Sequence, residues 1–238
     1  ALERKSHQGF NIIARFNPLN ETQILIGAHW DTRPFADKDS SRIDIPIEGA
    51  NDGGSGVGVL LEIARQLSIS PANVGVDIIF FDGEDYGKPN GIPSMEGDFL
   101  DWCLGSQYWS KQPHRYGYRA RFGILLDMVG AKNAQFNKEG TSMQYAPNVV
   151  RKVWTRADEL GYSHRFLNEE TPSTIDDNLF VSEFAGVPSA NIVDYRMNIR
   201  PMGYGFFHHT HADNMDIIDK QVLQEVGETV LSVVYSEM

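Results

Sequence analysis

The chain has 238 residues, of which 41% are hydrophobic and 22% are charged, enough to bury the core of one large globular domain. Its formal net charge of -11 and the lack of a lysine or arginine block argue against a nucleic-acid partner. The charge suits a cationic substrate, such as a peptide with a free amino terminus, but solubility alone also explains it. No stretch approaches the roughly 18–20 uninterrupted apolar residues of a membrane span, and a single cysteine, Cys103, excludes an internal disulfide and a cysteine-rich zinc module.

Short apolar runs predict five β-strands. Residues 11–16 and 22–29 flank the turn-like sequence NPLNE and are typical of a β-hairpin. Residues 76–82, 122–130 and 189–194 are nearly continuous apolar runs, as expected of strands that are buried on both faces of a parallel sheet.

Helical patterns alternate with these strands. Apolar residues recur at helical spacing in residues 55–67, in residues 147–161 and from about Asp219 onward. Two long polar segments, residues 31–49 and 86–99, are predicted loops, and loops of that length in a compact domain are usually functional or disordered. The alternation predicts an α/β layer fold in a single domain.

Acids and histidines fall where the predicted strands end. In open α/β sheets, sites form outside the carboxyl ends of the strands, so these side chains are predicted to share one crevice. Some also have a structural explanation, because Asp52 and Asp177 could cap helices and His29 could be a satisfied core histidine. The residues are His29, Asp31, Asp52, Asp82, Glu84, Asp85, Asp127, Asp176, Asp177, His208, His209 and His211.

The residue types favour zinc. Carboxylates and imidazoles without a thiolate are typical of a catalytic zinc site that keeps one coordination position open. Two adjacent acids, Glu84 and Asp85, supply one group to bind the metal and one to act as general base. The sequence therefore predicts a metal-assisted reaction at an amide carbonyl.

The order of the motifs resembles that of the zinc-dependent exopeptidases of the aminopeptidase type, and most of all the animal-type glutaminyl-peptide cyclotransferases and their bacterial relatives. The motifs are GAHWDT, GANDGGSG, FFDGEDYG, GSQYW, LLDMVG, IDDNLF, GVP and HHTHADN. The resemblance covers the chain from about residue 10 to the C-terminus. It implies one zinc-exopeptidase-like domain over residues 1–238, with a central, twisted, mixed and mostly parallel sheet flanked by helices.

The resemblance implies a set of metal ligands at the matching positions. Asp52, Asp85 and His209 would bind one zinc ion, and Asp85 stands where the animal enzymes have glutamate. The shorter aspartate is still expected to bind, with its backbone set slightly closer to the metal.

The resemblance also implies catalytic roles. Glu84 would be the general acid and base, and Asp127 and Asp177 would be active-site carboxylates that help to hold the substrate amine. The substrates would be peptides or proteins with a free N-terminal glutamine, which the reaction converts into pyroglutamate with release of ammonia.

Several positions depart from the family pattern. His208 stands where animal cyclotransferases have a tryptophan, Asn178 stands where the family usually has histidine, and their pocket tryptophan has no obvious counterpart soon after Glu84. An apolar substrate pocket is expected instead from Trp30, Tyr204, Phe206 and Phe207, with His208 in its wall.

Two alternatives stay open. In a two-zinc aminopeptidase, His29 and Asp127 would hold a second metal ion while Asp52 bridges the two ions. In a non-catalytic relative, the chain would keep the metal-binding fold for binding or structure, and the departures at Asn178 and His208 keep this alternative open. Metal stoichiometry separates the first alternative from a one-zinc cyclotransferase.

The cellular compartment is not fixed by the sequence. The first ten residues, ALERKSHQGF, lack the pattern of a charged and then apolar signal peptide, so the chain is either cytoplasmic or a processed form. The resemblance to bacterial relatives favours an exported protein, either periplasmic or anchored to a membrane.

Overall fold

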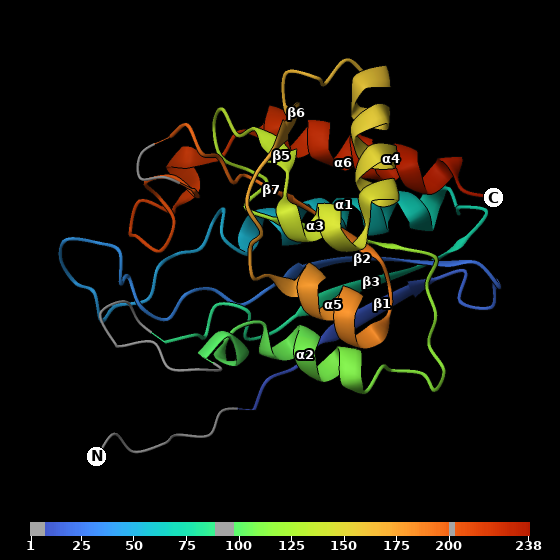
Figure 1. The fold of residues 1–238 in the computed structure, drawn as a ribbon, viewed down its shortest axis with the longest axis horizontal. Coiled ribbons are helices and arrows are strands. Elements are labelled where there is room, and N and C mark those ends of the chain that lie inside the picture. The colour runs from blue at the N-terminus through green and yellow to red at the C-terminus, as the bar shows by residue number, and fades with distance from the viewer. Residues whose placement is uncertain (1–7, 89–97, 200–202) are drawn as a thin grey trace.

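The computed structural model describes residues 8–88, 98–199 and 203–238 and has a central five-stranded sheet in the order β1-β3-β2-β4-β7 (Figure 1). β1 is antiparallel to its neighbour and the other strands are parallel, so the predicted mixed and mostly parallel sheet is confirmed. A small separate sheet pairs β5 (Phe136–Lys138) with β6 (Phe166–Glu170). The central strands are β1 (Ile12–Phe16), β2 (Gln23–His29), β3 (Gly75–Phe81), β4 (Gly123–Asp127) and β7 (Ser189–Val193).

The predicted hairpin between the first two strands is wrong. β1 pairs with β3 in antiparallel register, and β3 lies between β1 and β2. Every residue of β2 and of β3 is buried, whereas β1 exposes Ile12 to solvent. The partly exposed β1 thus forms one edge of the sheet, next to the fully buried β3.

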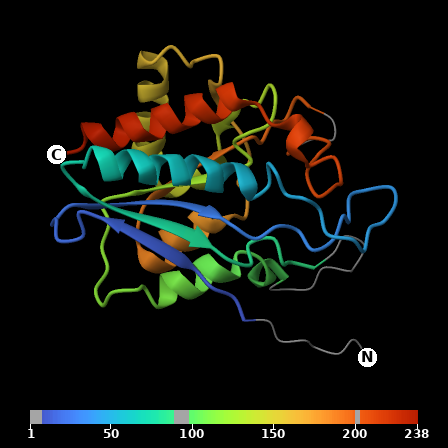
Figure 2. The ribbon, with the colours of Figure 1, turned by 180° about the vertical axis from the view of Figure 1, so that it is seen from behind.

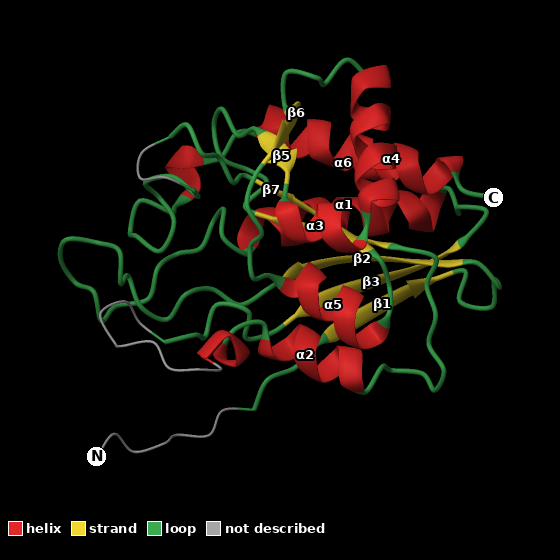
Figure 3. Cartoon of the chain, viewed as in Figure 1, coloured by secondary structure: helices red, strands yellow, loops and turns green. Residues whose placement is uncertain are grey.

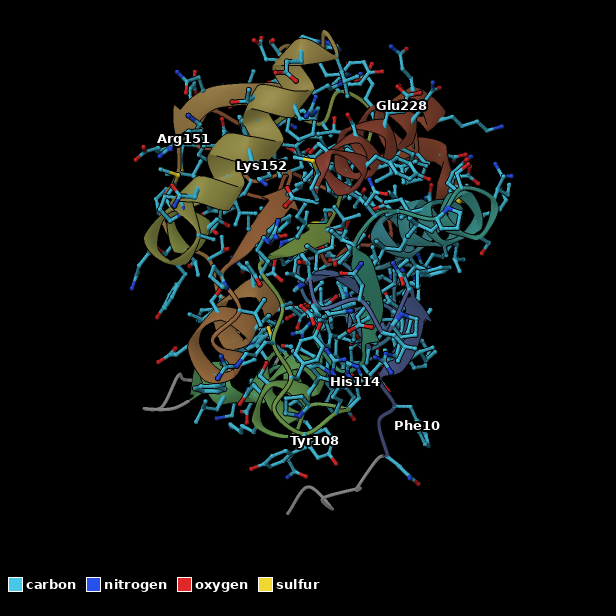
Figure 4. The ribbon with its side chains drawn as sticks, turned by 90° about the vertical axis from the view of Figure 1, so that its right-hand side faces the viewer. Phe10, Tyr108, His114, Arg151, Lys152 and Glu228 are labelled. Atoms are coloured by element: carbon cyan, nitrogen blue, oxygen red, sulfur yellow. The ribbon has the colours of Figure 1, made fainter. Side chains whose placement is uncertain are left out.

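Helices cover both faces of the sheet (Figures 1 and 2). In the view from the side, α4 with Lys152 and α6 with Glu228 lie on one side of the sheet and α2 with Tyr108 lies on the other (Figure 4). The first face is covered by α1 (Gly54–Ile69), α3 (Gly140–Tyr145), α4 (Pro147–Glu159) and α6 (Lys220–Ser236), and the second by α2 (Leu104–Lys111) and α5 (Asp177–Ala185). Within the described ranges, no helix has the length and apolar character to span a membrane.

Alternation along β2 builds an apolar core on each face. Ile24 and Ile26 belong to the cluster under α1, α4 and α6, whereas Leu25 packs on the other face with Trp109 of α2 and Val181 of α5. Burying each such side chain contributes about 1.5–3 kcal/mol relative to an exposed one. The two cores therefore hold the strand ends, and the side chains that follow them, in fixed positions.

A buried carboxylate ties α3 to the start of α5. Glu139 is the N-cap of α3, and its side chain accepts hydrogen bonds from the backbone N–H groups of Thr141 at 2.6 Å, Ser142 at 2.8 Å and Thr174 at 2.7 Å. Asn178 of α5, which is fully buried, donates to Ser142 Oγ at 3.1 Å and to Glu139 at 3.4 Å. Asn178 therefore has a structural role in this protein.

We expect Glu139→Gln to lower the free energy of unfolding by about 2–3 kcal/mol, because an amide nitrogen would face backbone donors in a buried site. Urea denaturation followed by circular dichroism measures the change. Glu159→Gln is the control, since Glu159 lies at the surface in an ion pair with Arg156, and its effect should stay within about 0.5 kcal/mol. Equal stability of Glu139→Gln and the unmodified protein would contradict the role given to Glu139.

Candidate active site

The long loops gather at the carboxyl ends of the parallel strands (Figure 3). The residues there line a pocket. β2 ends at His29, β4 ends at Asp127, and β3 leads directly into Asp82. The pocket volume of about 220 Å³ is below the roughly 300–1,000 Å³ of sites for drug-sized ligands, so it suits a small group. It is lined by Asp37, Lys38, Asp52, Glu84, Asp85, Trp102, Asp127, Met128, Ile175, Asp176, Tyr204, His208 and His209.

Asp31 holds the backbone of the acidic loop that follows β3. Its Oδ1 accepts a hydrogen bond from Glu84 N at 3.0 Å, and its Oδ2 accepts one from Asp85 N at 3.1 Å. His29 precedes it by two residues and places Nδ1 3.6 Å from Asp31 Oδ1. The adjacent acids Glu84 and Asp85 are therefore positioned by their main chain.

A second aspartate holds the turn that carries Asp52. The buried Asp213 accepts hydrogen bonds from the backbone N–H groups of Asn51 at 2.7 Å and Asp52 at 2.9 Å. Gly53 follows with a φ of 88°, and a Cβ atom there would lie 2.4 Å from the carbonyl oxygen of Asp31, so the turn requires glycine. Gly53 is also the N-cap of α1, which removes helix capping as an explanation of Asp52.

His209 connects the predicted zinc ligands. Its Nε2 lies 3.0 Å from Asp85 Oδ1 and 3.7 Å from Asp52 Oδ2. Its Nδ1 lies 3.6 Å from Asp37 Oδ1, so one nitrogen faces the two acids while the other has a separate carboxylate partner. A metal-ligating histidine commonly has such a second partner, which fixes the orientation of its ring.

The other two histidines of the cluster are held by the loop that contains residues 31–49. Lys38 Nζ contacts Nδ1 of His208, which lines the pocket. Asp39 accepts a hydrogen bond from His211 N at 3.0 Å, and His211 Nε2 lies 3.2 Å from the carbonyl oxygen of Arg42. The cluster thus divides into a candidate ligand, a pocket wall and a loop contact.

Left-handed backbone conformations gather at the pocket. Cys103, Met128 and His209 have φ values of 54°, 48° and 60°, and they are three of the six non-glycine residues with positive φ in the described parts of the chain. Met128 and His209 line the pocket, and the Cys103 thiol lies 3.3 Å from Glu84 Oε1. Such conformations cost of order 1–3 kcal/mol each and are concentrated at functional sites.

Several combinations of side chains could hold a metal ion. His29 Nε2 lies 3.2 Å from Asp127 Oδ1 and 3.3 Å from Asp52 Oδ1, which brings together the residues predicted for a second ion. Among the described residues, three groups have ligand atoms within 4.8 Å of one another: Asp52, His208 and His209; His29, Asp52 and Asp127; and His29, Glu84 and Asp85.

Unpartnered carboxylate oxygens indicate a place for a cation. Oδ2 of Asp52 and Oδ2 of Asp85 are buried and accept no hydrogen bond from any described residue. A buried acceptor without a partner costs about 1–3 kcal/mol, and more when it is charged. A cation would remove this cost, and carboxylate and imidazole are donors that Zn²⁺ accepts, so the residues fit a zinc ion.

Burial among like charges sets the protonation of the site. Burial and the charge of Asp85 raise the pKa of Glu84 well above its usual range and raise the pKa of Asp52 to about 7. Burial opposes ionisation of Asp85 as well, but a hydrogen bond and the charge of His209 outweigh it and lower the pKa of Asp85. Burial lowers the pKa of His209, but hydrogen bonds to Asp37 and Asp85 outweigh this effect and raise it to about 9. Glu84 is thus suited to accept and return a proton.

Two adjacent acids lie at the start of α5. Asp176 lines the pocket, whereas Asp177, which was predicted to be an active-site carboxylate, does not. Asp176 is the N-cap of α5, and its carboxylate accepts hydrogen bonds from Asp177 N at 2.6 Å and from Asn191 Nδ2. Asp177 is the first helical residue, and burial raises its pKa to about 7. The extended backbone of the N-cap turns the first acid of the pair, and not the second, toward the pocket.

Of the five residues predicted for an apolar substrate pocket, Tyr204 and His208 line this cavity, whereas Trp30, Phe206 and Phe207 lie outside its wall. Trp30 donates its indole N–H at 3.0 Å to the carbonyl of a residue that precedes β1, which holds the ring at the surface. Phe207 is buried in an apolar cluster that includes the pocket residue Met128, and Phe206 is 63% exposed. Aromatic residues near a motif in sequence therefore do not all share its pocket.

Trp102 is a pocket residue that the sequence did not reveal. Its ring stacks on His209, with ring centroids 6.0 Å apart and planes 8° from parallel. The buried guanidinium of Arg33 lies 4.6 Å from the Trp102 ring centroid and donates a hydrogen bond to the carbonyl oxygen of Asp85 at 2.6 Å. Trp102 follows the predicted loop at 86–99, of which residues 89–97 lie outside the described residues, so its distance from Glu84 in sequence gives no local signal.

The chain is similar to a known family and to solved structures of it. The model of peptidase family M28 matches residues 11–234. A Bacteroides thetaiotaomicron glutaminyl cyclase bound to N-acetylhistamine is 47% identical with a TM-score of 0.92, and the match covers 97% of this chain and 78% of that chain. A Zn-dependent exopeptidase from Parabacteroides distasonis ATCC 8503 is 44% identical with a TM-score of 0.92, over 96% of this chain and 78% of that chain.

Curated relatives include two kinds of enzyme. Aminopeptidase YwaD of Bacillus subtilis (strain 168) is 28% identical over 239 residues, which cover 94% of this chain and 44% of that protein. The glutaminyl-peptide cyclotransferase of Gloydius blomhoffii is 30% identical over 244 residues, which cover 92% of this chain and 62% of that protein. The chain therefore spans less than two thirds of the length of these curated relatives.

We expect Asp31→Asn to weaken Zn²⁺ affinity about 10- to 100-fold. The substitution puts an NH₂ group in place of one of the two carboxylate oxygens that accept from the backbone N–H groups of Glu84 and Asp85, so one of these hydrogen bonds is lost. Competition with a chromophoric chelator measures the affinity. Asp82→Asn is the matched control, since Asp82 lies on the same loop but its carboxylate accepts from Phe10 N outside the pocket. Unchanged affinity in Asp31→Asn would refute the positioning role of Asp31.

Proposed function

Because the chain belongs to peptidase family M28, we propose that it is a zinc-dependent glutaminyl-peptide cyclotransferase, which converts the N-terminal glutamine of peptides into pyroglutamate and releases ammonia. The observation that carries the proposal is the position of the Glu84 carboxylate. Its buried carboxylate lies in the pocket beside the candidate ligand Asp85, and Cys103 is its one hydrogen-bond partner among the described residues. A group in that position is free to exchange protons with a substrate.

Asp52, Asp85 and His209 would hold the zinc ion. Asp52 and Asp85 each have a buried oxygen without a hydrogen-bond partner, and His209 Nε2 faces both carboxylates. When bound, zinc would polarise the carbonyl group of the substrate's γ-carboxamide. The 44% identical Zn-dependent exopeptidase supports this choice of metal.

Glu84 would carry the proton in the reaction. The α-amine of the N-terminal glutamine attacks its own γ-carboxamide carbon, so a new C–N bond forms and the bond to the amide nitrogen breaks. Glu84 takes a proton from the attacking amine and delivers one to the departing ammonia. Burial and the charge of Asp85 raise the pKa of Glu84, which makes its carboxylate a stronger base than an exposed glutamate toward the proton of the amine.

Asp127 and Asp176 would orient the substrate amine. Both line the pocket, and Asp127 also lies 3.2 Å from His29 Nε2. We assign to Asp176 the role that the resemblance implied for Asp177, because Asp176 is the member of the pair in the pocket wall. Each carboxylate can accept a hydrogen bond from an amine that approaches from the open side.

A two-zinc aminopeptidase is the alternative that a specific observation favours. His29, Asp52 and Asp127 have ligand atoms within 4.8 Å of one another, and Asp52 also belongs to the first ligand set. A second ion there would bind a water nucleophile, and the product would be a free N-terminal amino acid. The similarity to aminopeptidase YwaD is consistent with this chemistry.

Glu84→Gln is expected to lower the rate of cyclisation by about 10²–10⁴-fold, because the amide cannot shuttle the proton, while zinc content stays unchanged. Ammonia release and the mass of the pyroglutamyl product, measured on a glutamine-initiated peptide, test this expectation. Glu62→Gln on the exposed face of α1 should have full activity. Full activity of Glu84→Gln would refute the mechanism, and zinc binding without turnover by the unmodified protein would favour the non-catalytic alternative.

We expect one tightly bound zinc ion per chain, because the cyclisation needs no water nucleophile. Elemental analysis of zinc-loaded protein after gel filtration measures the stoichiometry. Asp127→Asn should keep one ion and lose cyclisation activity. Two ions per chain, together with release of free amino acids from peptides, would overturn the proposal in favour of the aminopeptidase.

A further inference from the structure

Lys38 is the one lysine or arginine among the described residues that line the pocket. The other ionisable residues of the wall include six carboxylates and two histidines. Lys38 is exposed and also lines the pocket, so its side chain borders both the solvent and the pocket. A negatively charged ligand group would be repelled elsewhere in the pocket and attracted at this position.

The position of Lys38 is fixed by the histidine loop. Its backbone N–H donates to the carbonyl oxygen of His209 at 3.3 Å, and its Nζ contacts His208 Nδ1. The ammonium group also lies 6.0 Å from the centroid of the Tyr204 ring. The loop contacts place the lysine next to the candidate ligand His209 without making it a ligand.

The ammonium group of Lys38 keeps hydrogen-bond donors for a substrate. A lysine has three N–H donors and no acceptor, and His208 takes one of them. No carboxylate in the described ranges lies within 4.0 Å of Lys38 Nζ. Two donors and most of the charge are therefore available to a group that enters the pocket.

We propose that Lys38 selects substrates that carry a carboxylate close behind the N-terminal residue. This inference rests on the proposed function, which places the substrate amine and γ-carboxamide among the acids of the pocket. The next part of the peptide then passes Lys38, which borders the solvent. The carboxylate is either the side chain of an acidic second residue or the C-terminal carboxylate of a dipeptide, since both present the same group at a similar distance.

The selection acts on binding and not on the chemical step. Lys38 makes no described contact with Glu84 and is exposed, so its attraction should lower KM and leave kcat unchanged. Charge pairs at the surface change affinity by about two- to fivefold. The effect should fade as salt rises to 0.5 M, because exposed charges are screened.

The experiment compares peptides that differ only in this carboxylate. One pair is Gln-Glu-Ala amide and Gln-Gln-Ala amide, and the other is the dipeptide Gln-Ala with a free or an amidated C-terminus. We expect the unmodified protein to have about two- to fivefold lower KM for the acidic member of at least one pair. The pair that responds identifies the source of the carboxylate.

Lys38→Met should remove the difference in KM between the two members of a pair, a ratio that is measured within each variant and does not depend on a common change in activity. Lys111→Met is the matched control, because it makes the same change in net charge at the far end of α2, and it should keep the preference. Equal KM values within both pairs at low salt, or a preference that persists in Lys38→Met, would overturn the inference.

Failure of the proposed function gives a different result. If no peptide yields pyroglutamate, the cyclotransferase proposal fails, and calorimetric Kd values of the same four peptides then decide the role of Lys38. Tighter binding of an acidic member, lost in Lys38→Met and kept in Lys111→Met, would support the role of Lys38 without cyclisation. Equal Kd values would refute it.

Discussion

Mutual repulsion among buried carboxylates is the constraint on which the rest of the site depends. Six acids line one small pocket at the end of the sheet, and the low dielectric of a protein interior makes their charges costly. The fold offsets this cost with the imidazoles of His29 and His209 and with the ammonium of Lys38. What remains is a strong preference for a cation, which is the property that a metal site needs.

The acids are held in place by main-chain contacts more than by their own side chains. Asp31 accepts hydrogen bonds from the backbone N–H groups of Glu84 and Asp85. Asp213 accepts them from the backbone N–H groups of Asn51 and Asp52. Backbone amides are positive dipoles that cannot be lost by titration or by side-chain rotation. The arrangement therefore orders the candidate ligands without a bound ion, which reduces the entropy lost when an ion binds.

The sequence predicted the parts of the structure that follow from local patterns. Buried runs identified β3, β4 and β7, and Glu84, Asp85 and Asp127, which follow or end β3 and β4, line the pocket because parallel strands end at one edge. It could not predict that β1 pairs with β3, since the two strands are far apart in sequence and their pairing leaves no local pattern. The sequence could not tell which of Asp176 and Asp177 faces the pocket, because that depends on the backbone conformation of the N-cap. Nor could it predict the contact between Trp102 and His209, which forms only in the folded chain.

The left-handed backbone at Cys103, Met128 and His209 limits how the site can be transferred to another protein. Residues with a Cβ atom rarely adopt this conformation in isolation, so the surrounding cores must impose it. A peptide that contains only the HHTHADN motif would relax to other conformations, with its histidines free to chelate as three equal ligands. The inequality among the three histidines is a property of the whole fold, and grafting the motif alone onto a scaffold would lose it.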